Sequence, residues 1–168
     1  ARLDRAHARR QKVDAVVAGR PPELDNNVEV RATSPNTLVV VARADDAAHF
    51  DGARATCLLR EPGSGTRATM ANLLDELEIQ PPRMVMGSHG AVVAAAVAGL
   101  GVTLVSRQAV RRELDAGLLV ELAVPGTPLD RPWHIVTQAP CAGATELLTT
   151  HLIAPRELSW QAAGVTPP

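Results

Sequence analysis

The residues with the clearest chemical potential lie in the run Arg60-Glu-Pro-Gly-Ser-Gly-Thr-Arg67, which joins an expected strand to an expected helix. Backbone N–H groups at a helix N-terminus carry the positive end of the helix dipole, and glycines let a ligand approach the backbone closely. This combination predicts a cradle for an anion or carboxylate, whose donors would be Ser64, Gly65, Thr66 and Arg67. An ordinary glycine-rich turn with Ser64 as the helix N-cap explains the same residues without a ligand.

Polar residues also follow other expected strands, and ligands gather at such strand ends in open α/β sheets. Ser88 and His89 follow one strand and would supply a hydroxyl and an imidazole, although Ser88 fits an N-cap role equally well. Ser106 follows the next strand, where helix capping is the simpler explanation. Arg20 lies in the turn Gly19-Arg-Pro-Pro22, from which it would reach a ligand, a neighbouring subunit or only solvent.

Common catalytic and metal-binding patterns are missing from the sequence. It contains no GxSxG, HExxH, GxGxxG or P-loop pattern, and its 5 histidines show no metal-ligand spacing. These absences argue against an enzyme and predict neither a metal nor another cofactor. Cys57 and Cys141 lie far apart and form no CxxC pair, which favours two buried free thiols in a reducing cytoplasm over a disulfide.

Composition excludes two further classes of protein. Over 168 residues, 17 basic and 18 acidic side chains give a formal net charge of -1, without the basic excess of a free-standing nucleic-acid binder. No apolar run approaches the roughly 20 residues of a membrane-spanning helix, because Gly99 and Gly101 interrupt the longest one. Aromatic residues make up only 2% of the chain, so alanine, valine and leucine must supply the core.

The junction residues need elements that hold them in place, and apolar patterns predict these elements. Apolar residues at helical spacing predict helices from Met70 to Leu77, from Ala91 to Ala98 and from Ala144 to Ile153. The last helix would bury a stripe formed by Ala144, Leu147, Leu148 and Leu152. Strands and helices alternate, which predicts an α/β fold with a mostly parallel sheet. The expected strands are Val13–Val17, Asn27–Arg31, Thr37–Ala42, Thr56–Leu59, Arg83–Met86, Val102–Val105, Leu118–Leu122 and Trp133–Val136.

The order of three segments resembles the effector-binding domain of LysR-type transcriptional regulators. The last segment is the most specific, because it joins an alanine-rich helix, a Gly-Leu-Gly stop, a buried strand and a Glu-Leu-x-x-Gly-x-Leu ending. Within the family, the first two segments look most like the branch that regulates Calvin-cycle carbon fixation. The resemblance extends from about Val13 to Ile153, and its segments are Val13–Pro22, Leu58–Arg67 and Gly87–Ser106 with Glu113–Glu121.

The resemblance implies a two-lobed, periplasmic-binding-protein-like (type II) α/β fold, in which each lobe is a mixed, mostly parallel sheet with flanking helices. Two strands would cross between the lobes, near Thr37–Ala42 and Trp133–Val136. Lobe I would comprise residues 1–42 and 131–155, lobe II residues 43–130, and residues 156–168 a poorly ordered tail. We expect the first strand of lobe I and the family's N-terminal helix-turn-helix to be missing, with Ala1–Lys12 as the helix after that strand.

The resemblance also implies a function. The chain would sense a small, anionic metabolite bound between its lobes, as a cytoplasmic homodimer or homotetramer without a membrane partner. It would reach operator DNA only through the missing domain. A solute-binding protein of a transport system shares the fold and is the main alternative, and an enzyme is a third hypothesis. The expected effector-binding residues are Ser64, Gly65, Thr66, Arg67, Ser88, His89, Ser106 and Arg20.

Overall fold

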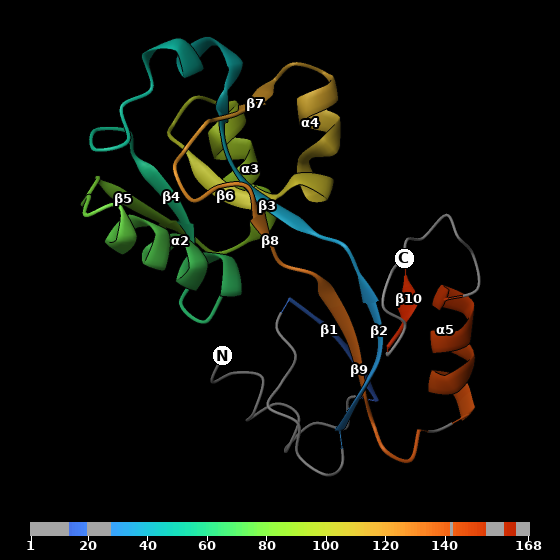
Figure 1. Ribbon diagram of the computed structural model, residues 1–168. Helices are drawn as coiled ribbons and strands as arrows, with labels where there is room; N and C mark the ends of the chain where they lie inside the picture. The colour runs from blue at the N-terminus through green and yellow to red at the C-terminus, as the bar shows by residue number, and fades with distance from the viewer. Residues whose placement is uncertain (1–13, 20–27, 142, 154–159, 164–168) are drawn as a thin grey trace. The chain divides into compact units, whose positions relative to one another are not determined.

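The computed structural model describes residues 14–19, 28–141, 143–153 and 160–163, and the chain divides into two compact units (Figure 1). Unit 1 contains Thr37–Leu129, and unit 2 contains the described residues before Thr37 together with those from Asp130 onwards. The division falls before the strand Thr37–Ala42, which the sequence assigned to lobe I. The expected helix Ala1–Lys12 and the candidate residue Arg20 lie outside the described residues.

Unit 1 contains a larger sheet and a parallel two-stranded sheet, which a bridge between Cys57 and Val102 joins into one layer. Its strands are β3 (Thr37–Arg43), β4 (Cys57–Arg60), β5 (Arg83–Met86), β6 (Thr103–Ser106), β7 (Leu119–Glu121) and β8 (Leu129–Asp130). β4 and β5 pair in parallel, and the chain entering β6 meets the other side of β4, where Leu58 N donates to Val102 O at 2.8 Å. β3 runs antiparallel to β6 and β7, and β8 also pairs with β3.

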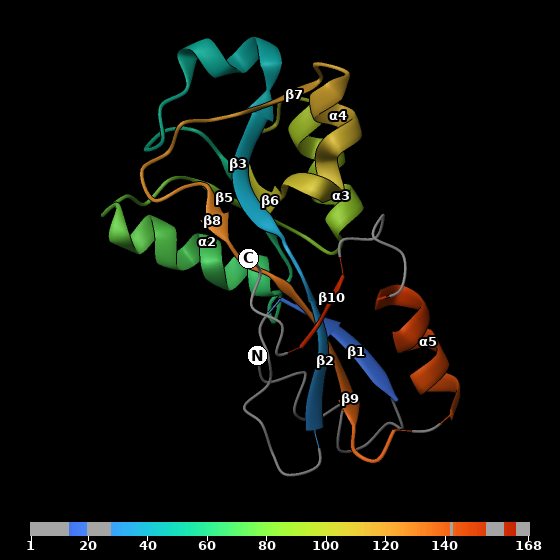
Figure 2. The same ribbon diagram turned by 45° about the vertical axis from the view of Figure 1, so that its right-hand side comes forward.

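Helices cover both faces of this sheet, and Figure 2 shows α2 and α3 on opposite sides of β3. The helices are η1 (Ala44–His49, a 3₁₀ helix), α2 (Gly65–Glu76), α3 (His89–Val97), η2 (Arg107–Val110, a 3₁₀ helix) and α4 (Arg111–Asp115). Leu38 and Val40 of β3 pack in the apolar cluster that contains Leu73 of α2, whereas Val39 and Val41 pack in the cluster that contains α3. β3 is therefore buried on both faces, as its unbroken apolar run predicts.

Two glycines make the passage from α3 into β6 possible. Gly99 has a φ of +77° and ends α3, with its N–H donating to Ala96 O and the N–H of Leu100 donating to Ala95 O, both at 3.0 Å. At Gly101, φ is +156°, and a Cβ would lie 2.1 Å from the carbonyl oxygen of Thr56. Only glycine lets the chain pass this close to the start of β4.

Unit 2 is an antiparallel sheet with one helix among its described residues. Its strands follow the order β1-β9-β2-β10, with β1 (Ala15–Ala18), β2 (Val28–Ser34), β9 (Trp133–Gln138) and β10 (Gln161–Ala162), and its helix is α5 (Gly143–Ile153). Asn36 and Arg131 join the segments that follow β2 and precede β9. The N–H of Arg131 donates to Asn36 O at 2.7 Å, and Nδ2 of Asn36 donates to Arg131 O at 2.8 Å.

The directions of the strands differ from the expected mostly parallel arrangement. The parallel contacts join β4 to β5 and the start of β4 to the chain entering β6, all within the β4–α2–β5–α3–β6 segment Cys57–Ser106. The pairs of β3 with β6 and β7 in unit 1, and the strand pairs of unit 2, are antiparallel. The expected disordered tail is also partly wrong, since β10 pairs with β2 and Ala163 N donates to Arg31 O at 2.9 Å.

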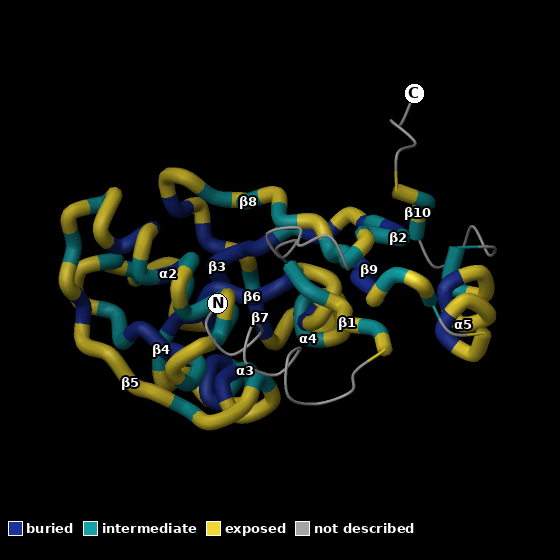
Figure 3. Tube along the Cα trace, turned by 90° about the horizontal axis from the view of Figure 1, so that it is seen from below, coloured by how far each residue is buried: buried dark blue, intermediate teal, exposed yellow. Residues whose placement is uncertain are grey.

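The predicted buried stripe of α5 is wrong. Leu147 and Leu148 are 74% and 50% exposed, and Ala144 is also exposed, whereas Leu152 is half-buried. Thr145 and Thr149 form the buried face instead (Figure 3). The hydroxyl of Thr149 donates to Thr145 O at 2.8 Å, and this bond satisfies the polar group that burial would otherwise leave unpaired.

Candidate functional site

The predicted ligand-binding residues other than Arg20 lie in unit 1, at the edge where β4, β5 and β6 end. Arg60 and Met86 are register partners at the ends of β4 and β5, and Ser106 ends β6. Because these strands run in the same direction, the helices that follow them begin at the same edge. The structure therefore brings Ser64–Arg67, Ser88–His89 and Ser106 to one side of unit 1, as the sequence predicted.

The first turn of α2 offers hydrogen-bond donors that its own serine does not occupy. Ser64 holds the N-cap position, but its side chain makes no capping hydrogen bond, contrary to the N-cap role considered for it. Its Oγ instead lies 2.9 Å from Oγ1 of Thr66. The first N–H groups of any α-helix lack partners within the helix. This end of α2 thus combines backbone amides, a positive dipole end and a hydroxyl pair.

Two arginines flank the start of α2, and their charges are balanced differently. Arg60 forms a bidentate ion pair with Glu61, at 2.7 Å and 2.6 Å. The guanidinium of Arg60 lowers the pKa of the Glu61 carboxyl to about 2, so this pair is charged on both sides near neutral pH. The half-buried Arg67 donates through Nη1 to Arg60 O at 3.0 Å, and no carboxylate in the described part of the chain pairs with it. Arg67 therefore supplies the unbalanced positive charge.

Ser88 and His89 begin α3 and have separate roles. Oγ of Ser88 accepts the N–H of Ala91 at 3.1 Å, so Ser88 is a side-chain N-cap. Nε2 of His89 is buried and has no hydrogen-bond partner. Burial and, secondarily, the charge of Arg60 lower the pKa of His89, while Glu113 raises it. A buried nitrogen without a partner costs free energy, so a ligand atom or a water there would be stabilising.

Ser106 lies at the third strand end and is 7% exposed. It precedes η2, but its side chain makes no capping hydrogen bond, so the capping explanation favoured by the sequence is wrong. The neighbouring Arg107 binds both carboxylate oxygens of Glu121, at 2.6 Å and 2.7 Å, and this contact lowers the pKa of Glu121. Arg107 is therefore already neutralised, unlike Arg67.

Sequence reasoning missed the part played by Arg60 and Glu61. Arg60 is the last residue of β4, it faces His89 closely enough to lower its pKa, and it accepts the hydrogen bond from Arg67 through its carbonyl. The adjacent opposite charges in Arg60-Glu61 were a usable signal, because neighbours of this kind can neutralise each other at a strand end. Their position between β4 and α2 makes them part of the site.

The backbone amides, hydroxyls and guanidinium at the start of α2 are groups that can bind an anion without forming a covalent bond. In the described part of the chain, no cluster of three or more His, Cys, Asp or Glu side chains could hold a metal ion. Cys57 is buried, Cys141 is half-buried, and both are free thiols. Within the same residues, no helix has the length and apolar character needed to cross a membrane.

Comparison with models of protein families shows which family this chain belongs to. The family model for the LysR substrate binding domain matches residues 5–146. This chain belongs to that family. It is 39% identical over 131 residues to the HTH-type transcriptional regulator CbbR of Rhodospirillum rubrum, covering 74% of this chain and 43% of that protein. It is 38% identical over 138 residues to the RuBisCO operon transcriptional regulator of Acidithiobacillus ferrooxidans, covering 77% of this chain and 44% of that protein.

Solved structures show the same fold. The regulatory domain of CcmR from Synechocystis PCC6803, in complex with 2-PG, matches with a TM-score of 0.76 at 24% identity, over 90% of this chain and 77% of that one. LysG from Corynebacterium glutamicum with bound effector Arg matches with a TM-score of 0.72 at 17% identity, over 91% of this chain and 54% of that one. The expected LysR family and type II periplasmic-binding-protein-like fold are confirmed. The chain spans less than half the length of the two curated relatives.

Proposed function

We propose that this LysR substrate-binding domain senses a small anion at the carboxyl edge of the unit 1 sheet. The proposal rests on Arg67 in the first turn of α2. Arg67 has no carboxylate partner in the described chain, and it lies at the N-terminal, positive end of the helix dipole. The hydroxyls of Ser64 and Thr66 and the backbone of Gly65 complete the cradle. Ser88, His89 and Ser106, at the neighbouring strand ends, are proposed to contact the same ligand, with Nε2 of His89 as an unsatisfied partner.

The chemistry of the ligand follows from these donors. Backbone amides, hydroxyls and a guanidinium bind carboxylate and phosphate oxygens best. The CcmR regulatory domain, which shares the fold, was solved with 2-PG, and this supports a small anionic ligand for the present chain. LysG was solved with Arg, so the fold also accepts a cationic amino acid. The absence of a carboxylate partner at Arg67 favours the anion here.

The rest of the regulator is proposed from its relatives. Their names describe HTH-type regulators and a RuBisCO operon regulator, so we infer a role in controlling carbon-fixation genes through a DNA-binding domain elsewhere in the polypeptide. Ligand binding would favour one arrangement of a cytoplasmic homodimer or homotetramer, and such coupling is typically about 1–3 kcal/mol. No catalytic step is proposed, and with regulators as relatives the transport alternative has no support of its own.

Calorimetry on the chain with 2-PG, inorganic phosphate and arginine tests the anion site. Arg67→Ala should weaken binding of the anions roughly ten- to hundredfold, because a hydrogen bond to a charged group contributes about 1.5–3 kcal/mol. Arg54→Ala is the matched control, since Arg54 is 88% exposed and precedes the amino end of β4. Unchanged anion affinity in Arg67→Ala, or an equal loss in Arg54→Ala, would contradict the proposal.

A further inference from the structure

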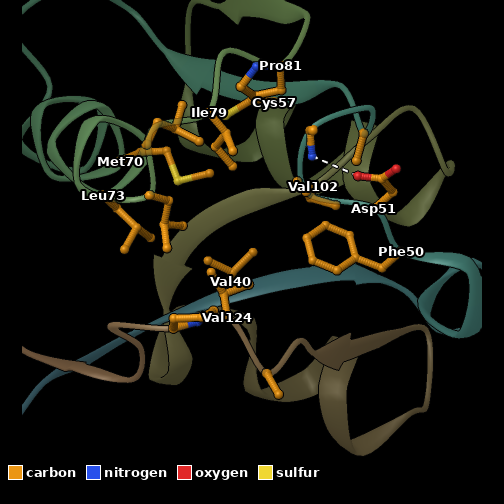
Figure 4. A pocket seen from close by; sticks show the side chains of 17 residues that line it. Val40, Phe50, Asp51, Cys57, Met70, Leu73, Ile79, Pro81, Val102 and Val124 are labelled. Atoms are coloured by element: carbon orange, nitrogen blue, oxygen red, sulfur yellow. Dashed lines mark hydrogen bonds between the residues drawn. The ribbon is translucent and has the colours of Figure 1, made fainter.

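Unit 1 contains a cavity of about 340 Å³ on the α2 face of its sheet, away from the strand ends described above. Its floor comes from Val40 of β3 and from Cys57 at the start of β4. Met70 and Leu73 of α2 form one wall, and Phe50 faces them from the segment after η1 (Figure 4). The lining therefore comes from elements far apart in sequence that the fold of unit 1 brings together.

The cavity is apolar because its polar groups are already satisfied or neutral. Asp51 carries the only charged side chain among the 17 residues that line it. Oδ1 of Asp51 accepts the N–H of Ala53 at 2.9 Å, and Arg54 lies 3.8 Å from its other oxygen. Burial raises the pKa of the Cys57 thiol to about 11, so this group is uncharged near neutral pH. Asp51 is exposed, so no buried charged side chain in the lining could pair with a charged ligand.

Small residues and a fixed turn keep the cavity open. Gly52, Ala53 and Ala123 line the cavity at positions where larger side chains would fill it. The turn after Val124 is held by Thr127, which donates to Val124 O through its N–H at 3.0 Å and through its hydroxyl at 2.8 Å. The space is thus built into the fold and does not depend on a side chain moving aside.

We propose that this cavity is a binding site for a small, uncharged, apolar molecule of one or two rings. Apolar cavities of about 150 Å³ already hold benzene, and ligand pockets begin at roughly 300 Å³. A cavity of about 340 Å³ therefore has room for a bicyclic compound. The site is separate from the anion site at the start of α2, and neither proposal depends on the other.

Indole is the probe, and methionine methyl groups report its position. The chain has 3 methionines: Met70 lines the cavity, whereas Met84 and Met86 lie on β5 and do not. In protein labelled with ¹³C at the methionine methyls, indole added without any anion should shift the Met70 signal saturably and leave the other two in place. In Arg67→Ala protein, which lacks the proposed anion contact, indole should still shift the Met70 signal, whereas indole-3-carboxylate, which has the same rings and a charge, should shift none of the three.

Two variants that fill the cavity test the location. Ala53 and Ala123 line the cavity and are exposed, so Ala53→Trp and Ala123→Phe should each weaken indole binding at least tenfold while leaving far-ultraviolet circular dichroism unchanged. Ala94→Trp is the control, since Ala94 is exposed on α3 on the other face of the sheet. A Met70 signal that never saturates overturns the proposal, as does indole binding that survives in both filled variants.

Discussion

Two serines occupy equivalent positions at the starts of α2 and α3, and the structure predicts that their loss has different costs. Oγ of Ser88 accepts the N–H of Ala91 at 3.1 Å and caps α3. Oγ of Ser64 makes no such bond and contacts the hydroxyl of Thr66 at 2.9 Å. Ser88→Ala and Ser64→Ala therefore remove the same atom from the same helix position, but only the first removes a cap.

The expected magnitudes follow from these contacts. Loss of an N-cap hydrogen bond costs about 1 kcal/mol, so Ser88→Ala should lower the free energy of unfolding by that amount. Ser64→Ala loses a half-buried hydroxyl pair whose remaining member can bind water, and should cost about 0.5 kcal/mol or less. Ser88→Asp restores an acceptor at the cap and should recover most of the loss.

Urea unfolding followed by two probes measures these differences. Both tryptophans, Trp133 and Trp160, lie in unit 2, whereas α2 and α3 lie in unit 1. Tryptophan fluorescence therefore reports unit 2, and helical circular dichroism reports mainly unit 1, so their coincidence tests whether the units unfold together. Ser64→Ala costing as much as Ser88→Ala, or Ser88→Asp failing to recover stability, would refute the assignment of the cap.

Two further predictions concern the close contact at Gly101 and the titration of His89. Gly101→Ala places a Cβ 2.1 Å from Thr56 O, which accepts the N–H of Val102, and should lower the free energy of unfolding in urea by about 3 kcal/mol or more. Gly117→Ala is the control, because a Cβ there meets nothing within 4 Å, and it should cost about 1 kcal/mol. Equal losses in the two variants would argue against a clash at Gly101. Burial and Arg60 lower the pKa of His89 below 6.5, so the unfolded chain binds more protons there, and stability should fall as pH drops through 6.5. Glutamine does not titrate, so the melting temperature of His89→Gln should change less between about pH 7.5 and 5 than that of the unmodified chain. Parallel pH profiles for the two proteins would contradict the lowered pKa of His89.

Local patterns in the sequence predicted most of unit 1. The unbroken run Thr37–Ala42 predicted a strand buried on both faces, because only such a strand can place every side chain in an apolar environment. Short apolar runs predicted these strands with ends at Leu59, Met86 and Val105, and the structure ends them at Arg60, Met86 and Ser106. Their common edge followed from the strand–helix–strand order, and the structure brings the described candidate residues to that edge.

Features that depend on distant pairing could not be predicted in the same way. The leucines of α5 have the spacing of a buried stripe, but Thr145 and Thr149 are the buried residues, and the hydroxyl of Thr149 is satisfied by Thr145 O. β10 has only two residues, so its pairing with β2 left no periodic pattern in the sequence. The antiparallel pairs of unit 2 likewise join segments far apart in the chain, such as Ala15 and Thr137.

The site shows why residue types at a strand end do not by themselves identify a ligand contact. The sequence offers Arg60, Arg67 and Arg107 at this edge as equivalent cations. In the structure, Glu61 neutralises Arg60 and Glu121 neutralises Arg107, while Arg67 is held by the carbonyl of Arg60, which orients its guanidinium without cancelling its charge. A bound anion would thus meet one positioned, unbalanced cation at the positive end of α2, where charge and helix dipole act in the same direction.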